Sequence, residues 1–89
     1  MVVDVRNSGE LERGFIPGFV HIPLAALVER LDELDPTVPT VVHCASGYRS
    51  MIAASLLSAR GFTDVSDLLG GYEAWAIAQR DLDKADIQR

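Results

Sequence analysis

The chain has 89 residues, of which 48% are hydrophobic and 24% are charged, and its 13 acidic and 8 basic side chains give a net charge of −5. This length fits one domain rather than two, and the hydrophobic content excludes an intrinsically disordered chain. The negative charge argues against nucleic acid as a partner, because it repels phosphate backbones. No apolar run approaches the ~20 residues that cross a membrane, so we expect a soluble, cytoplasmic domain without membrane contact.

The first quarter of the chain predicts two strands separated by a turn. The β-branched run at residues 2–6 is typical of a buried strand, and the polar residues 7–9 end it. Glycine and proline place a turn at residues 14–18, because proline fixes φ and glycine supplies unusual backbone angles. Residues 19–22 are a short strand candidate.

A helix is expected next. From Leu24 to Leu34, leucine and valine recur at helical spacing, and charged residues occupy the other face. Pro23 suits the first turn of such a helix. Asp35-Pro36 ends it, because the residue before proline avoids helical geometry.

The next segment predicts a strand, a helix and a second strand. Thr40–His43 is a hydrophobic strand, and residues 50–60 have the pattern of a helix. Gly61 is expected to stop this helix, with Phe62 behind it as a hydrophobic C-cap contact. Residues 65–69 form the next short strand.

The last segment predicts a helix whose inward face carries Trp75, Ala78 and Leu82, with Trp75 in the core. The acidic stretch that follows is typical of a solvated helix end or a linker. We therefore expect a domain over residues 1–80 and a tail over residues 81–89.

Strands that alternate with helices are typical of an α/β domain with a mainly parallel sheet. In such sheets the functional crevice lies beyond the carboxyl ends of the strands. Cys44, the single cysteine of the chain, lies at such a place because it directly follows the strand at Thr40–His43. One thiol cannot form an internal disulfide, which favours a reducing compartment, and we expect no metal site.

The loop after this strand combines a thiol with groups that stabilise anions. A helix N-terminus and a nearby guanidinium lower the pKa of a thiol, and the thiolate is the reactive form of cysteine. Residues 45–49 can turn their backbone N–H groups toward Cys44, Gly47 permits a left-handed angle, and Arg49 adds a forked cation. A lone cysteine at a strand end is more often a small buried side chain. The combination instead indicates a nucleophile in an anion-binding loop.

The segment Cys44-Ala45-Ser46-Gly47-Tyr48-Arg49-Ser50 resembles the active-site loop of the rhodanese family of sulfurtransferases. Shorter matches follow in family order along nearly the whole chain: Asp4-Val5-Arg6, Glu10, Gly14, Ile16-Pro17-Gly18, Ile22-Pro23-Leu24, Gly61-Phe62, Val65, Leu68, Gly70-Gly71 and Ala74-Trp75. The resemblance implies a rhodanese-like, three-layer α/β/α fold around a central, mainly parallel sheet. It also implies a persulfide on Cys44, and the residues expected to bind substrate are Ala45, Ser46, Gly47, Tyr48, Arg49 and Ser50.

The chain also departs from the family pattern. Leu11, Phe15, Phe19 and His21 replace residues that are common in the family's second motif, and we expect them to affect the choice of substrate more than the chemistry. We expect the strand and helix that usually lead the family fold to be missing before Asp4-Val5-Arg6. We therefore expect either a larger, multidomain parent chain or self-association through an exposed sheet edge.

Three polar residues and one aromatic residue near the loop have several possible roles. Asp4 and Arg6 either support the loop through hydrogen bonds or form a structural ion pair or solvated strand ends. His43 is interpreted as a strand-end histidine bonded to the backbone. Tyr48 is expected to point outward, where it could touch an acceptor.

Loop length separates two chemistries that share this fold. Cysteine phosphatases place five residues between cysteine and arginine, whereas four residues separate Cys44 from Arg49, and Ser50 stands where a phosphatase needs arginine. A tighter loop encloses a smaller group, which favours a sulfane sulfur over a phosphoryl group.

We therefore expect a sulfurtransferase in which the Cys44 thiolate takes a sulfane sulfur from thiosulfate or a small persulfide, both anionic donors. A thiol or cyanide acceptor then removes the sulfur, so the kinetics should be ping-pong, and no metal or organic cofactor is needed. Two alternatives stay open. One is a non-catalytic interaction or regulatory module of a larger sulfur-metabolism protein, and the other is a cysteine phosphatase or arsenate reductase.

Overall fold

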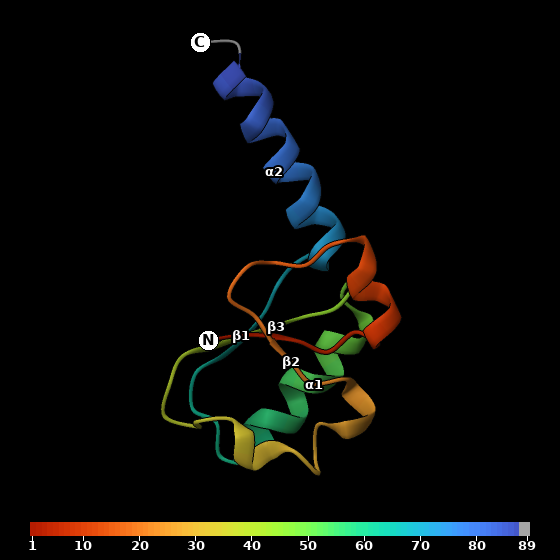
Figure 1. The fold of residues 1–89 in the computed structure, drawn as a ribbon. Helices are drawn as coiled ribbons and strands as arrows, with labels where there is room; N and C mark the ends of the chain where they lie inside the picture. The colour runs from red at the N-terminus through yellow and green to blue at the C-terminus, as the bar shows by residue number, and fades with distance from the viewer. Residues whose placement is uncertain (88–89) are drawn as a thin grey trace.

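A computed structural model describes residues 1–87, whose fold is shown in Figure 1. The strands (β), 3₁₀ helices (η) and α-helices (α) follow in this order: β1 (Val2–Asp4), η1 (Ser8–Arg13), β2 (Val20–His21), η2 (Leu24–Ala26), η3 (Leu31–Glu33), β3 (Thr40–His43), α1 (Tyr48–Ala59), β4 (Val65–Asp67) and α2 (Gly71–Ile87). The strands form one parallel sheet in the order β2-β1-β3-β4. The predicted α/β class, a central parallel sheet flanked by helices, is confirmed.

The two central strands, β1 and β3, are short, β-branched and buried. Val3 and Val42 are paired in register, and neither is exposed to solvent. Parallel strands covered on both faces are typically such continuous apolar runs. Because the strands are parallel, their carboxyl ends meet at one edge of the sheet, where Asp4 lies beside His43. Cys44 follows at that edge.

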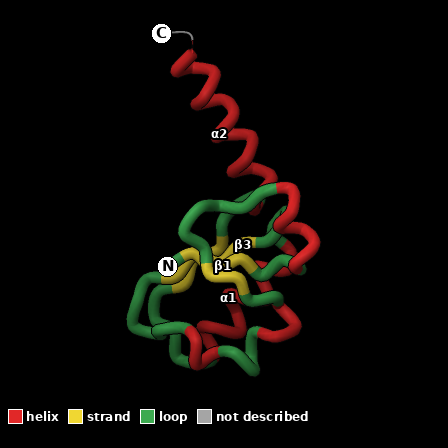
Figure 2. Tube along the Cα trace, in the orientation of Figure 1, coloured by secondary structure: helices red, strands yellow, loops and turns green. Residues whose placement is uncertain are grey.

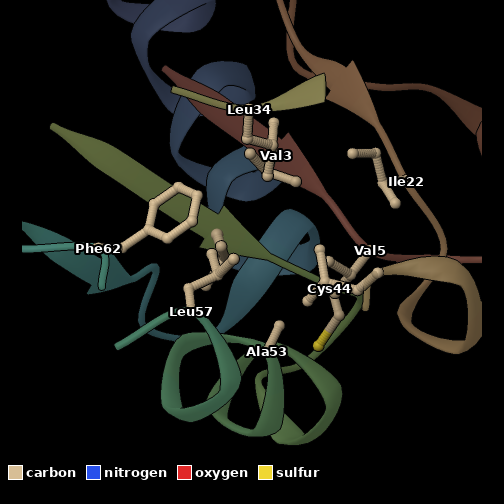
Figure 3. Packing of buried hydrophobic residues seen from close by; sticks show 10 residues of the cluster. Val3, Val5, Ile22, Leu34, Cys44, Ala53, Leu57 and Phe62 are labelled. Carbon is tan, nitrogen blue, oxygen red and sulfur yellow. The ribbon is translucent and has the colours of Figure 1, made fainter. Parts of the chain in front are cut away.

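The core lies between the sheet and α1, as Figure 3 shows. Its buried apolar residues are Val3, Val5, Ile22, Leu27, Leu34, Val42, Cys44, Ala53, Leu57 and Phe62. In Figure 3, Ala53 and Leu57 project from α1 toward the strands, and the sulfur of Cys44 is directed toward the same helix. The packing of α1 on the sheet therefore also positions the candidate nucleophile.

The single helix predicted between Leu24 and Leu34 is wrong. The structure has two 3₁₀ helices, η2 and η3, joined by a turn, and the backbone of Arg30 (φ −110°, ψ 19°) interrupts helical geometry. In a 3₁₀ helix residues i and i+3 lie on one side, so leucines three apart can share a face there as they do in an α-helix. Leu27 and Leu34, which close the two short helices, are buried in the core. An isolated α-helix of this length is marginal, so packing decides the local geometry.

The helix α1 begins at Tyr48, two residues earlier than predicted, and its end agrees with the prediction. Gly61 has a positive φ of 93°, and the N–H groups of Gly61 and Phe62 donate to carbonyls of the last turn, over 3.4 and 3.1 Å. This pattern is a Schellman motif. Phe62 is buried in the core beside it, so the expected hydrophobic C-cap is confirmed.

The helix α2 runs away from the sheet, as Figures 1 and 2 show. Trp75 is half-buried, whereas Ala78 and Leu82 are exposed, so the predicted inward face is wrong beyond the first turns. Residues 81–87 of the predicted tail continue α2, residues 88–89 lie outside the described part, and the boundary at residue 80 stays a prediction. Within the described residues, no helix is both long enough and apolar enough to cross a membrane.

Candidate active site

Cys44 directly follows β3, and its side chain is only 1% exposed. The backbone N–H groups of Gly47 and Ser50 donate to its Sγ over 3.2 and 3.4 Å, and the Ser50 Oγ lies 3.5 Å from the same sulfur. Gly47 has a φ of 124°, a left-handed angle that favours glycine. The loop and the first turn of α1 therefore surround the sulfur with hydrogen-bonding groups.

Two opposing effects act on the pKa of the Cys44 thiol. Burial raises the pKa, but hydrogen bonds from Ser50 and from the backbone N–H groups of Gly47 and Ser46 outweigh burial and lower it from its ordinary value. A lowered pKa increases the fraction of thiolate near neutral pH, and the thiolate is the nucleophilic form of cysteine.

The first turn of α2 fixes the orientation of the same loop. The N–H groups of Tyr72 and Glu73 donate to the carbonyls of Cys44 and Ala45, over 2.7 and 3.1 Å. Gly71, with a φ of 60°, passes so close that a Cβ placed on it would lie 2.5 Å from the Cys44 carbonyl oxygen. Because these carbonyls are bound by α2, the N–H groups of the loop remain available to the sulfur.

Arg49, predicted as a cation beside the sulfur, is held by a carboxylate from η1. Its two terminal nitrogens donate to the two carboxylate oxygens of Glu10, over 2.6 and 2.8 Å. The hydrogen bond from Arg49 lowers the pKa of Glu10 to about 2. The same hydrogen bond raises the pKa of Arg49, against the effect of burial, and the charges of Glu10 and Cys44 add to it. The guanidinium therefore joins η1 to the loop.

The 3₁₀ helix η1 was missed from the sequence, although a local signal for it exists. Asn7 and Glu10 form a capping box, in which the Asn7 N–H donates to the Glu10 carboxylate over 3.0 Å. An asparagine followed three residues later by glutamate is a known helix-start pattern. Glu10 therefore caps η1 with the same carboxylate that binds Arg49.

Of the interpretations open for Asp4 and Arg6, the structure shows a buried ion pair. The Arg6 Nη2 lies 2.8 Å from the Asp4 carboxylate, and the two side chains are 3% and 0% exposed. Arg6 also donates to the carbonyl of Gly14 over 2.9 Å, and its guanidinium carbon lies 4.4 Å from the centre of the Tyr72 ring. Arg6 therefore links β1, the turn after η1, and α2 beneath the loop.

His43 was interpreted as bonded to the backbone, and this stays a prediction, because a backbone contact with Cys44 acts on its pKa but is not a hydrogen bond of standard geometry. Its ring is fully buried, and neither ring nitrogen has a hydrogen-bond partner among the described residues. The Nε2 atom lies 3.7 Å from the Asp4 carboxylate. Burial lowers the pKa of His43, and the charge of Asp4 opposes it only in part. A neutral imidazole fits this buried position.

Asp67, at the end of β4, is a site residue that the sequence analysis did not single out. Its Oδ1 accepts a hydrogen bond from the Ser50 Oγ over 2.5 Å. Ser50 is fully buried, and it contacts the Cys44 sulfur on its other side. Asp67 is 17 residues beyond Ser50, and a single sequence carries no signal for such a distant contact.

A hollow of about 500 Å³ adjoins the loop and is lined by Arg6, Gly9, Glu10, Arg13, Ala45, Tyr72 and Glu73. A larger hollow of about 810 Å³ lies along α2, and no residue of the Cys44 loop lines it. We take the smaller hollow as the approach to the site, because Ala45 adjoins the cysteine. Tyr48 is 71% exposed and points outward, as expected.

Comparison with known proteins identifies the same family that the sequence motifs indicate. The model of the family described as "Rhodanese-like domain" matches residues 1–78. The thiosulfate sulfurtransferase GlpE of Pseudomonas syringae is 37% identical over 75 residues, which cover 84% of this chain and 71% of that protein. The crystal structure of a rhodanese-related protein from Thermoplasma volcanium superposes with a TM-score of 0.82 at 35% identity, covering 86% of this chain and 76% of that one.

Other relatives are much longer than this chain. The Bacillus subtilis protein YrkF is 38% identical over 74 residues, which are 83% of this chain but 40% of YrkF. The chain therefore spans less than half the length of that relative. Some relatives thus carry a matching region as one part of a larger protein.

Proposed function

Because the chain belongs to the rhodanese-like domain family, we propose that it is a sulfurtransferase that takes a sulfane sulfur from thiosulfate or a small persulfide. Its acceptor is a thiol or cyanide. The similarity to a thiosulfate sulfurtransferase supports the choice of donor. The observation that carries the proposal is the buried Cys44 sulfur, which accepts backbone hydrogen bonds from Gly47 and Ser50.

The reaction proceeds in two sulfur transfers. The Cys44 thiolate attacks the outer sulfur of thiosulfate, a new S–S bond forms, and the old S–S bond breaks with its electron pair leaving on sulfite. The outer sulfur of the resulting persulfide is then attacked by the acceptor. Its bond to Cys44 breaks, and the electron pair returns to Cys44 as thiolate. The enzyme ends in its starting state without a cofactor.

The loop residues serve both transfers. The N–H groups of Ser46, Gly47 and Ser50 stabilise negative charge on sulfur, and the positive end of α1 adds to their effect. Ala45 lines the hollow beside the loop, and Tyr48 lies exposed on the same loop. Their side chains offer an apolar contact and an exposed aromatic ring, which suit an incoming acceptor.

Arg49, Asp4 and Arg6 support this loop in the proposed mechanism. The bidentate pair of Arg49 with Glu10 holds η1 beside the loop and keeps a cation near the donor. The buried pair of Asp4 and Arg6 holds the underlying strand end in place.

Turnover kinetics test the proposal. Thiosulfate and cyanide should yield sulfite and thiocyanate with ping-pong kinetics, and Cys44→Ser should abolish the reaction because a hydroxyl is a far poorer nucleophile near neutral pH. Ser55→Ala, on the exposed face of α1, is the matched control and should keep the activity. Release of phosphate from an aryl phosphate without sulfur transfer would overturn the proposal in favour of a phosphatase. No turnover of either substrate would favour a binding module.

A further inference from the structure

Three side chains from three elements form a continuous polar chain at the site. Cys44 follows β3, Ser50 lies in the first turn of α1, and Asp67 ends β4. The Cys44 sulfur donates to the Ser50 Oγ over 3.5 Å, and the Ser50 Oγ donates to the Asp67 carboxylate over 2.5 Å. Cys44 and Ser50 are essentially excluded from solvent, whereas Asp67 is half-buried at the sheet edge.

The number of available protons decides how Asp67 affects the hydrogen bond between Ser50 and Cys44. Ser50 has one hydroxyl proton, and its possible acceptors are the Asp67 carboxylate, the Gly47 carbonyl at 3.2 Å and the Cys44 sulfur. An ionised carboxylate accepts and cannot donate, and hydrogen bonds to charged acceptors are the stronger ones. The proton therefore lies toward Asp67. The Ser50 oxygen then presents a lone pair to Cys44, which suits a protonated thiol and not a thiolate.

We propose that Asp67 is a positioning residue that holds the Ser50 hydroxyl proton and thereby limits how strongly the site stabilises the Cys44 thiolate. Without the carboxylate, the Ser50 hydroxyl is free to donate to the sulfur. Asp67 acts through Ser50 and does not touch the sulfur itself.

The catalytic consequence rests on the proposed sulfur transfer. Cys44 is the nucleophile in the first transfer and the leaving group in the second. A thiolate becomes less nucleophilic as its pKa falls, but a thiol of lower pKa leaves faster. By withholding a hydrogen bond from the thiolate, Asp67 favours attack on the donor at the expense of release to the acceptor.

The other charged or titratable groups near the sulfur come from α1, the strands and α2. Arg49, from α1, is held by Glu10, from η1. On the strand side, the buried His43 precedes Cys44 and lies 3.7 Å from Asp4, whose carboxylate is bound by Arg6. From α2, Glu73 contacts the loop through its backbone N–H group. The Ser50 hydroxyl is thus the group through which the half-buried Asp67 carboxylate acts on the Cys44 sulfur.

The test measures the pKa of the Cys44 thiol from the pH dependence of its alkylation by iodoacetamide, which is unambiguous because the chain has one cysteine. Asp67→Asn should lower this pKa by about half a unit to one unit, which is roughly a 3- to 10-fold change in the thiolate equilibrium. Asp64→Asn makes the same charge change at an exposed position near the opposite end of β4, and it should leave the pKa unchanged.

A second variant separates the hydrogen bond from simple charge repulsion. Ser50→Ala alone should shift the pKa of Cys44 less than Asp67→Asn does, because the hydroxyl proton that it removes already lies toward Asp67. Adding Asp67→Asn to Ser50→Ala should then shift the pKa no more than Asp64→Asn does. If Ser50→Ala fails to fold, as judged by circular dichroism, Asp67→Ala supplies the test and should lower the pKa as Asp67→Asn does.

Two results would overturn the proposal. One is a Cys44 pKa that Asp67→Asn leaves unchanged or raises. The other is that Asp67→Asn lowers the pKa of Cys44 by the same amount in the unmodified protein and in the Ser50→Ala variant. Alkylation requires no sulfur transfer, so these results are independent of whether the protein turns over thiosulfate.

Discussion

Glu10 and Arg49 form the contact that joins η1 to the Cys44 loop. The guanidinium binds both carboxylate oxygens, and the two side chains are 34% and 30% exposed. Partial exposure screens the charges, so the value of the pair lies in its fixed bidentate geometry more than in its Coulomb energy. The pair therefore orients Arg49 and holds η1 against the loop.

The pH dependence of stability should report this pair. The pKa of Glu10 is lowered from 4.5 to about 2 in the folded protein, first by its hydrogen bond with Arg49. A depressed carboxyl pKa stabilises the fold above about pH 4.5, and this contribution is lost as the pH falls toward 2. Glu10→Gln should therefore lower the urea midpoint at pH 7 and flatten its decline between pH 4.5 and 2. The control Glu12→Gln, on the exposed side of η1, should follow the unmodified protein, and an equal decline in both variants would contradict the assignment.

At the residue scale the sequence predicted a loop whose backbone N–H groups face the Cys44 sulfur, as the structure has it, but not the partners of this loop. Cys44, Gly47 and Ser50 are neighbours along the chain, so their proximity follows from local geometry. Glu10 and Asp67 reach the same site from elements that are distant in sequence, and no pattern in one sequence specifies such pairings. The orientation of Arg49 toward Glu10 was unpredicted for the same reason.

The first turn of α2 is the element that holds the loop from outside. Its N–H groups bind the carbonyls of Cys44 and Ala45, and this contact requires the chain to pass very close at Gly71. The rest of α2 leaves the sheet, as Figure 2 shows. The N-terminal turn of this helix therefore serves the site, while its later turns lie apart from the sheet.

Gly71→Ala should disturb both stability and the site. The new Cβ would lie 2.5 Å from the Cys44 oxygen and 2.7 Å from the Ala45 oxygen, and the backbone φ of 60° is itself costly for alanine. We expect a loss of about 2 kcal/mol or more in the free energy of unfolding, measured by urea denaturation. Gly9→Ala meets no atom within 4 Å and should be neutral or stabilising. Equal stability of the two variants would show that the close approach at Gly71 is not required.

At the element scale, the sequence predicted those features of the helices that depend on local motifs, whereas tertiary packing determined the others. The end of α1 was predicted because Gly61 and Phe62 form a local motif whose geometry does not depend on distant residues. Residues 24–34 were wrongly predicted because leucine spacing fits both a 3₁₀ and an α-helix. The inward face predicted for α2 was wrong for the opposite reason. Its apolar residues do have helical spacing, but α2 extends beyond the sheet, so Leu82 has no core to pack against and is exposed.

On the scale of the whole molecule, the parallel sheet gathers the site at one edge. The carboxyl ends of β1, β3 and β4 supply Asp4, Cys44 and Asp67, and the first turns of α1 and α2 close around the loop. Strand alternation predicted this arrangement, because parallel strands place their carboxyl ends together. The negative net charge would not attract the proposed anionic donor, so in the proposed function the loop binds it through local N–H groups.

The mass of the intact protein after incubation with thiosulfate tests the central claim most directly, namely that Cys44 carries the transferred sulfur. We predict an increase equal to one sulfur atom, located on the peptide that contains Cys44 and removed by cyanide. Cys44→Ser should gain no mass under the same conditions. An unmodified protein whose Cys44 is nevertheless readily alkylated would contradict the claim, because the thiol would then be accessible and reactive without accepting sulfur.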